Sequence, residues 1–270
     1  MENKEITVVY MVAGMSSRFG GKIKQFARVG PKGETLIECS LKQAIAAGIG
    51  KVIFIVGEKT EAGFKEMFGD NYGGIEVKYA YQYFNPAERD KPWGTTDALC
   101  CALGILDSPF VVCNGDDIYG ENTFRILVEH LKNKKGSATI GYKLGEVLSE
   151  VGSVNRGMYV VESGKVKSIT ETFDITRDNL KSKGLSEEDL CSQNIFALYP
   201  ETVLQLNNVL IKFKEEHKGD RKIECLLPKE LNDLIVKGKL ELTLYPTPDK
   251  WIGVTNPADE EAVRKALAFN

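Results

Sequence analysis

The sequence predicts an α/β protein built on a doubly wound, mostly parallel mixed sheet. Strand-like apolar runs alternate with helical patterns along the first half, as in folds whose parallel strands are joined by helices. The first of these runs, residues 7–13, breaks into a loop of small residues, and a later run, residues 110–113, ends close to two adjacent aspartates. Because ligands bind at the carboxyl edge of such sheets, both breaks are expected to face a binding site.

The elements of the first half follow from their apolar spacing. A helix is expected over residues 36–49, because its apolar residues share one helical face and glycines end it. A short buried strand at 52–56, a helix at 61–68 and an alternating strand at 75–81 come next. A helix capped by a threonine is expected over 96–106, then the buried strand 110–113 and an amphipathic helix over 122–132.

The sequence pattern changes in the second half of the chain. Strands over residues 138–142, 157–161 and 166–170 are joined by turns, and a strand over 191–198 follows a polar surface excursion at 174–189. Helices over 200–216 and 227–237, a strand over 240–245 and a terminal helix opened by Pro257 complete the chain. Because there is no linker or repeat, we expect one domain over residues 1–270.

Composition narrows the class of protein. The 270 residues are 43% hydrophobic and 27% charged with a formal net charge of −3, which argues against nucleic acid or a membrane surface as the main partner. The first residues are too polar for a signal peptide, and no apolar run approaches the ~20 residues of a membrane span. Six cysteines without a C-x-x-C pair are expected to be free thiols in a reducing compartment. These features predict a cytoplasmic protein.

The loop after the first strand has the chemistry of a phosphate site. Its small residues let backbone N–H groups approach phosphate oxygens, and Arg18, Lys22 and Lys24 can neutralise their charge. No Gly-Lys-Ser/Thr closes the loop as in a P-loop, and only Gly14 matches the three glycines of a dinucleotide-binding turn. The loop is therefore expected to hold polyphosphate by another geometry.

The end of the strand at 110–113 has the chemistry of a metal site. Asn114, Asp116 and Asp117 crowd one strand end, and carboxylates packed that closely need a cation to offset their repulsion. Oxygen ligands suit Mg²⁺ that arrives with a nucleotide. We therefore expect Mg²⁺ as the cofactor, bound here.

With these motifs in this order, the chain resembles the nucleotidyltransferases that make nucleotide-sugars from an NTP and a sugar 1-phosphate. The resemblance covers residue 6 to about 102 and residues 111–120 well, and the C-terminal half more loosely. It implies a Rossmann-like fold in which residues up to about 135 form the nucleotide-binding half. Residues from about 136 to 256 then form an acceptor-binding lobe, and residues 257–270 form a terminal helix.

The resemblance also assigns roles to residues of the nucleotide half. Arg18 would contact the β- and γ-phosphates, Lys24 the phosphates in the transition state, and Asp116 the metal as its primary ligand. Gln82, whose amide can pair with a base edge, and Gly94 would read a pyrimidine. The expected nucleotide-binding residues are Ala13, Gly14, Met15, Ser16, Ser17, Gln82, Gly94 and Thr95. Ser16 stands where the family carries a second glycine, and Thr95-Thr96 match the family only in part.

In the second half the resemblance implies an acceptor pocket of paired donors and acceptors for hydroxyl groups. Its expected residues are Asn114, Gly157, Glu171 and Asn194, with Asn194 inside a strand. The family commonly has a lysine after this glutamate, where this chain has Thr172, so binding of an acceptor phosphate is less firmly predicted than binding of the acceptor hydroxyls.

The second metal ligand of the family is missing. The family places an aspartate two residues after a tryptophan near the C-terminus, and here Trp251 is followed by Gly253. Asp117 would point to the opposite face from Asp116 if the strand continued, whereas Asp249 could swing in from before the tryptophan. We therefore expect Asp116 to be the sole essential protein ligand.

These observations predict a nucleotidylyltransferase. A phosphate oxygen of the acceptor, a sugar 1-phosphate, would attack the α-phosphorus of UTP or dTTP in line and release pyrophosphate, without a general base. Two alternatives stay open: a cytidylyltransferase that acts on a non-sugar phosphate, and a nucleotide-binding regulatory relative without turnover. The sequence leaves the base, the acceptor and the oligomeric state, a homo-oligomer included, undetermined.

Overall fold

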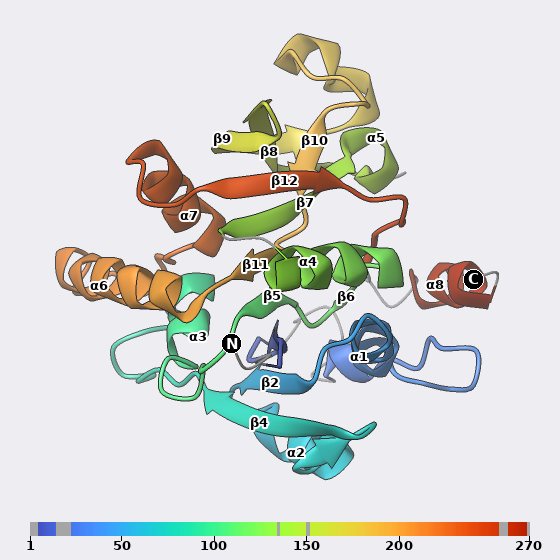
Figure 1. Ribbon diagram of the computed structural model, residues 1–270. Coiled ribbons are helices and arrows are strands. Elements are labelled where there is room, and N and C mark those ends of the chain that lie inside the picture. The colour runs from blue at the N-terminus through green and yellow to red at the C-terminus, as the bar shows by residue number, and fades with distance from the viewer. Residues whose placement is uncertain (1–4, 15–22, 134–135, 150–151, 254–258, 269–270) are drawn as a thin grey trace.

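The computed structural model describes residues 5–14, 23–133, 136–149, 152–253 and 259–268 (Figure 1). Within them, eleven strands form one mixed sheet in the order β10-β8-β9-β12-β7-β11-β5-β1-β2-β4-β3. These strands are β1 (Thr7–Met11), β2 (Lys51–Val56), β3 (Asn71–Tyr72), β4 (Ile75–Tyr81), β5 (Phe110–Asn114), β7 (Ser137–Lys143), β8 (Val154–Glu162), β9 (Lys165–Ile175), β10 (Leu190–Ser192), β11 (Phe196–Leu198) and β12 (Leu242–Pro246). Two short strands, β6 (Asp117–Ile118) and β13 (Ile252–Gly253), pair separately.

The centre of the sheet is parallel and buried on both faces. β1 lies between β2 and β5 and is parallel to both, and β4 continues the parallel set on the other side of β2. All six residues of β2 are buried, as expected of a central strand covered by helices on both faces. This arrangement brings the carboxyl ends of β1, β2, β4 and β5 to one edge of the sheet.

Helices cover both faces of the sheet and create two hydrophobic clusters. On one face α1 (Leu36–Ala46), α2 (Glu61–Phe68) and α4 (Glu121–Asn133) pack on side chains such as Tyr10 and Phe54. On the other face α3 (Thr95–Cys100), α6 (Pro200–Glu216) and α7 (Leu227–Val236) pack on side chains such as Val9 and Val112. The remaining helices are η2 (Lys24–Phe26), α5 (Leu144–Val147), η3 (Arg177–Asn179), η4 (Lys181–Lys183) and α8 (Asp259–Ala268).

The two halves of the chain share this sheet. β11 belongs to the second half but lies antiparallel between β5 and β7, so it joins the central strands to the later ones. β8, β9 and β10 form one end of the molecule, and β4 with α2 forms the other (Figure 1). The predicted α/β, Rossmann-like fold with a mixed sheet is therefore confirmed.

Several expected elements differ in detail from the structure. α3 ends at Cys100 instead of 106, and its N-cap is Gly94 with φ +100°, so the predicted threonine cap is wrong. The expected strand 191–198 is split into β10 and β11, because Asn194 adopts a left-handed φ of +57°. All six cysteines are free thiols, as predicted. No helix in the described ranges is long and apolar enough to cross a membrane.

Candidate active site

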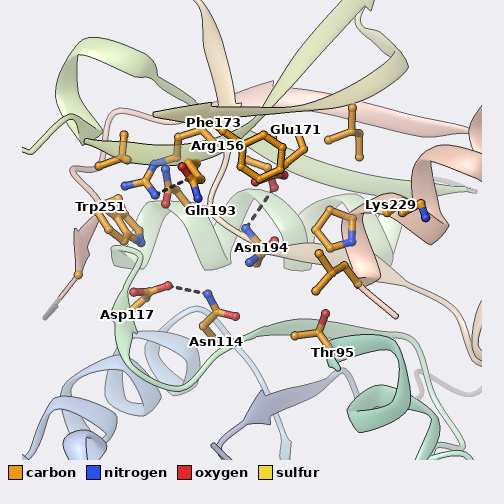
Figure 2. Close-up of a pocket in the computed structure, with 18 of the residues that line it drawn as sticks. Thr95, Asn114, Asp117, Arg156, Glu171, Phe173, Gln193, Asn194, Lys229 and Trp251 are labelled. Carbon is orange, nitrogen blue, oxygen red and sulfur yellow. Dashed lines mark hydrogen bonds between the residues drawn. The ribbon is translucent and has the colours of Figure 1, made fainter. Parts of the chain in front are cut away.

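A cavity of ≈ 710 Å³ lies where the carboxyl edge of the central strands meets the second half of the chain. Figure 2 shows side chains of the two halves on opposite walls, with Thr95, Asn114 and Asp117 on one and residues of β8, β9 and the β10–β11 connection on the other. The cavity lining includes every expected acceptor residue: Asn114, Gly157, Glu171 and Asn194. It also includes Lys24, Thr95 and Asp116. Side chains expected to contact phosphates and side chains expected to contact hydroxyl groups therefore line the same cavity.

Lys24 and Asp116 meet on the wall of this cavity that the first half of the chain forms. Lys24 lies in η2, and its Nζ is 2.8 Å from Asp116 Oδ2, although the two residues are far apart in the sequence. The lysine side chain is only 11% exposed, and the neighbouring Phe26 anchors η2 by packing on Phe64 of α2 at 4.9 Å between ring centroids. The ammonium group is therefore held in place and offsets the charge of one aspartate.

Asp117 is the buried member of the aspartate pair. Its Oδ2 accepts hydrogen bonds from Asn114 Nδ2 at 2.9 Å and from the Tyr119 hydroxyl at 3.2 Å. Burial, followed by the nearby charge of Asp116, raises the pKa of Asp117 to about 7. A carboxyl group in this state is only partly ionised at neutral pH, and a cation bound beside it would favour the carboxylate form.

The structure corrects the expected direction of Asp117. β5 ends at Asn114, Gly115 and Asp116 form a turn, and Asp117 opens β6, so the strand does not continue through the pair. The alternation that would place consecutive side chains on opposite faces is interrupted. Both carboxylates consequently line the same cavity.

Residue 253 leaves no space for a further acid. β13 pairs antiparallel with β6, and Gly253 is opposite Asp117. A Cβ atom at this glycine would overlap the Trp251 indole ring and lie 3.2 Å from Asp117 Oδ1. The indole and the Asp117 carboxylate therefore occupy the space that a side chain at 253 would need.

Asp249, the other acid considered from the sequence, has a structural role. Its Oδ2 accepts from the Thr123 amide at 2.8 Å and its Oδ1 from Asn122 Nδ2 at 2.9 Å, both in the first turn of α4. A carboxylate that caps the amides of a helix N-terminus stabilises the helix. Asp249 does not line the cavity, so the expectation that it could swing into a metal site finds no support in this geometry.

The residues expected to bind the base lie behind the cavity wall. Gln82 is buried, and its Nε2 donates to the Gly94 carbonyl at 3.0 Å and to Asp97 Oδ2 at 2.8 Å. Lys214 of α6 in turn contacts Asp97 Oδ1 at 2.5 Å. Both amide hydrogens of Gln82 are therefore used within the protein and Oε1 remains as an acceptor, and the base contact expected of Gln82 stays a prediction.

Gly94 and Thr95 are held by the second half of the chain. A Cβ atom at Gly94 would lie 2.6 Å from the Cys225 carbonyl oxygen, so only glycine fits this close approach. Thr95 Oγ1 accepts a hydrogen bond from the Leu227 amide at 2.8 Å. Ala13 and Gly14 follow β1 at the same edge. Five further residues of the loop fall outside the described residues: Met15, Ser16, Ser17, Arg18 and Lys22.

The opposite wall of the cavity is built by β8, β9 and β10. Gly157 of β8 pairs with Glu171 of β9 and with Ser192 of β10, which brings three strands together at one point. Burial raises the pKa of the Glu171 carboxyl, and the charge of Arg156 partly opposes this effect. Asn194 lies in the connection from β10 to β11, and its backbone N–H donates to Ser192 Oγ at 3.1 Å.

Arg156, Gln193 and Trp251 line the cavity but were not expected from the sequence. Arg156 Nη1 donates to the Asn155 carbonyl at 3.0 Å and Nη2 to the Val147 carbonyl at 3.1 Å, and the guanidinium lies 5.2 Å from the centroid of the Trp251 ring. The backbone carbonyl of Gln193 accepts a hydrogen bond from the Tyr119 hydroxyl at 2.9 Å. The sequence Asn155-Arg156-Gly157, which ends in the buried glycine of β8, is the available signal for Arg156.

The donor set of the cavity suits a hard cation. Asp116, Asp117 and the Asn114 amide offer oxygen ligands, and Lys24 offsets only one of the two carboxylates. The described residues hold no cluster of three or more His, Cys, Asp or Glu side chains, so they do not form a closed metal cage. A divalent ion bound at these residues would take other ligands from a nucleotide or from water.

Comparison with known proteins gives a family match and several structural matches. Residues 21–243 match the family model described as nucleotidyl transferase. A Bacillus anthracis protein described as a glucose-1-phosphate thymidylyltransferase has a TM-score of 0.68 at 15% identity, covering 97% of this chain and 95% of its own. The inositol-1-phosphate CTP transferase of T. maritima has a TM-score of 0.69 at 14% identity, covering 99% and 97%.

A third structure, HddC from Yersinia pseudotuberculosis complexed with GMP-PN, has a TM-score of 0.63 at 14% identity and covers 97% of this chain and 99% of its own. At these identities the three structures support the fold alone. The search of curated protein sequences found no match.

Proposed function

Because the chain belongs to the nucleotidyl transferase family, we propose that it joins an NTP, UTP or dTTP, to a sugar 1-phosphate and releases pyrophosphate. The observation that carries this proposal is the shared cavity. The Lys24–Asp116 pair lies on its nucleotide side, and polar side chains of β8, β9 and the β10–β11 connection lie on the other. A nucleotide and a hydroxyl-rich phosphate can therefore meet in one space.

The chemistry follows from charge and position. An acceptor phosphate oxygen attacks the α-phosphorus in line, and because a phosphate monoester is already ionised near neutral pH, no general base is required. Lys24 neutralises charge that develops on the leaving pyrophosphate, with Arg18 as its expected partner on the β- and γ-phosphates. Asp116 would hold Mg²⁺ with Asp117 beside it, and the bound ion would supply charge neutralisation at the phosphates.

The acceptor side supports a polyhydroxyl substrate. Asn114, Glu171 and Asn194 offer amide and carboxylate groups from β5, β9 and the β10–β11 connection, which can pair with hydroxyl groups. The thymidylyltransferase among the similar structures supports a sugar 1-phosphate. The inositol-1-phosphate CTP transferase supports the alternative, a cytidylyltransferase that uses a non-sugar phosphate.

A regulatory relative without turnover is the second alternative. It would have no need of an oriented ammonium group beside an aspartate. The Lys24–Asp116 contact at 2.8 Å between widely separated residues therefore favours an enzyme.

Pyrophosphate release tests the proposal. The protein is incubated with Mg²⁺ and each of UTP, dTTP, CTP, ATP and GTP, paired with glucose 1-phosphate, inositol 1-phosphate or no acceptor. We expect release with UTP or dTTP and the sugar phosphate. Lys24→Ala should lower kcat by about 10²–10³-fold with little change in nucleotide affinity, because the ammonium acts most strongly on the transition state.

Asp116→Asn should abolish release, whereas Lys42→Ala, which changes an exposed lysine of α1 outside the cavity, should leave it unchanged. Release that depends on CTP and inositol 1-phosphate would select the cytidylyltransferase. Nucleotide binding without release in any pairing would select the regulatory relative.

A further inference from the structure

Two buried N–H groups on the acceptor side of the cavity have no hydrogen-bond partner among the described residues. They are Arg156 Nε and Trp251 Nε1. A buried donor without a partner is costly, and native proteins almost always satisfy such groups with protein, water or a bound ligand. Both residues line the same cavity, and Figure 2 shows them next to each other on its wall. Their shared position indicates that a ligand atom completes them.

The surrounding contacts fix the position of both donors before any ligand arrives. The two outer nitrogens of Arg156 are bound to backbone carbonyls of Asn155 and Val147, so the guanidinium cannot turn freely. The Trp251 ring packs beside the guanidinium. Because Gly253 has no side chain, the indole can occupy the space next to this glycine. A preorganised site loses little conformational entropy on binding.

The charge of the site selects an anion. Arg156 forms no ion pair within the described ranges, although Asp117 and Glu171 also line the cavity. Among the described lining residues the cations are Lys24, Arg156 and Lys229. Lys24 is bound to Asp116 and Lys229 is an exposed residue of α7, which leaves Arg156 as the half-buried lining cation that forms no ion pair among the described residues.

A guanidinium edge and a nearby indole N–H match the oxygens of a phosphate group. Arg156 lies on β8 directly before Gly157, on the wall opposite Asn114 and Asp117. Resting on the proposed function, we infer that Arg156 and Trp251 form the subsite that binds the phosphate group of the acceptor substrate. The subsite would hold that phosphate beside the two aspartates while Glu171 and Asn194 contact the rest of the acceptor.

The decisive variant is Trp251→Phe, which removes the indole N–H and keeps an aromatic ring beside Arg156. Binding of glucose 1-phosphate and of inorganic phosphate is measured by calorimetry in the absence of nucleotide, and UTP binding is measured separately. We expect Trp251→Phe to weaken binding of both phosphates about tenfold, the usual loss for one hydrogen bond to a charged group. Arg156→Met should weaken it at least a hundredfold, and Arg156→Lys should restore part of the loss.

The nucleotide should still bind within twofold of wild type in each variant, because the subsite belongs to the acceptor. Arg177→Met is the matched control, since Arg177 pairs with Glu187 outside the cavity. Circular dichroism and retained UTP binding show that each variant is folded. Steady-state kinetics should show a raised KM for the acceptor and an unchanged KM for the NTP.

Wild-type phosphate affinity in Trp251→Phe and Arg156→Met would overturn the subsite. Loss of UTP binding with unchanged phosphate binding would overturn it as well, because the two donors would then belong to the nucleotide. If wild type releases pyrophosphate from a sugar 1-phosphate and the variants keep its acceptor KM, only the subsite is wrong. If wild type binds phosphate as described but releases no pyrophosphate, only the proposed reaction is wrong.

Discussion

Gly253 shows how one missing side chain shapes the cavity. Its position opposite Asp117 leaves space for the Trp251 indole against the backbone of residue 253, and the same space admits Asp117 Oδ1. A side chain here would have to displace one of the two. The glycine therefore determines where the carboxylate and the indole N–H can be.

We predict that Gly253→Ala destabilises the protein by about 1–3 kcal/mol, the usual cost of forcing extra atoms into a packed site. The free energy of unfolding is measured by urea denaturation. Gly104→Ala is the matched control, because a Cβ atom at Gly104 would meet nothing within 4 Å. Equal stability of Gly253→Ala and wild type would show that the indole moves without cost.

The chemistry of single residues was predictable only where it depends on strand ends. The carboxyl-edge rule predicts that the loop after β1 and the aspartates after β5 face a binding site, and the structure places Lys24 Nζ 2.8 Å from Asp116 Oδ2. The direction of Asp117 depends on the turn at Gly115, which strand alternation alone does not reveal. Arg156 and Trp251 become neighbours only when β13 returns to β6, so their unpartnered donors have no local signature.

At the scale of elements, α1 carries the clearest local signal. Thr35 and Glu38 form a capping box, in which the Glu38 amide donates to Thr35 Oγ1 and the Thr35 amide donates to Glu38 Oε2. Burial would raise the pKa of the Glu38 carboxyl, but hydrogen bonds from Thr35 and the Tyr72 hydroxyl outweigh it and hold the pKa below its usual value. The ionised carboxylate therefore stabilises the folded state.

The sign of the pH dependence follows from this shift. A carboxyl group with a lowered pKa in the folded state stabilises the protein above its unfolded pKa, and the contribution is lost as the pH falls through the folded value. We predict that Glu38→Ala lowers the free energy of unfolding by about 1 kcal/mol at pH 7. The difference from wild type should shrink as the pH is lowered below about 4.5, the ordinary value for a glutamate.

Urea denaturation at pH 7 and at pH 3.5 measures this difference. Glu66→Ala serves as the control, since Glu66 is an exposed residue of α2. A Glu38→Ala defect of the same size at both pH values would show that the carboxylate form of Glu38 is not what stabilises α1.

Long periodic elements were predictable and short paired ones were not. The apolar spacing gave the bounds of α2, β4 and α6 as they are in the structure. The two-residue strands β6 and β13 exist because they pair with each other. The break at Asn194 separates β10 from β11, which each pair antiparallel with a different part of β7. Such features depend on contacts between distant parts of the chain.

At the scale of the whole molecule, one sheet runs through both halves of the chain. Phe196 of β11 is buried and pairs with Val112 on one side and Thr139 on the other. The hydrophobic cluster around Tyr10 also extends to Ile140 of β7. Neither half can expose its core without opening the other.

We predict a single cooperative unfolding transition, with far-ultraviolet circular dichroism and tryptophan fluorescence coinciding in urea. Phe196→Ala should shift the entire transition by about 3–5 kcal/mol, because it leaves a cavity in the shared core. Phe173→Ala, which changes an exposed side chain, is the control for stability. Two separate transitions would show that the halves are independent domains.

The return of β13 to β6 also orders events during synthesis. The first half emerges from the ribosome with Lys24 and both aspartates, but Trp251 and Gly253 follow only after most of the chain. A nascent chain therefore contains the charged lining residues of the first half long before the residues of β13 that complete the cavity. The cavity lining is complete only once the late segment has paired with β6, so a chain that ends before Trp251 lacks this part of the cavity.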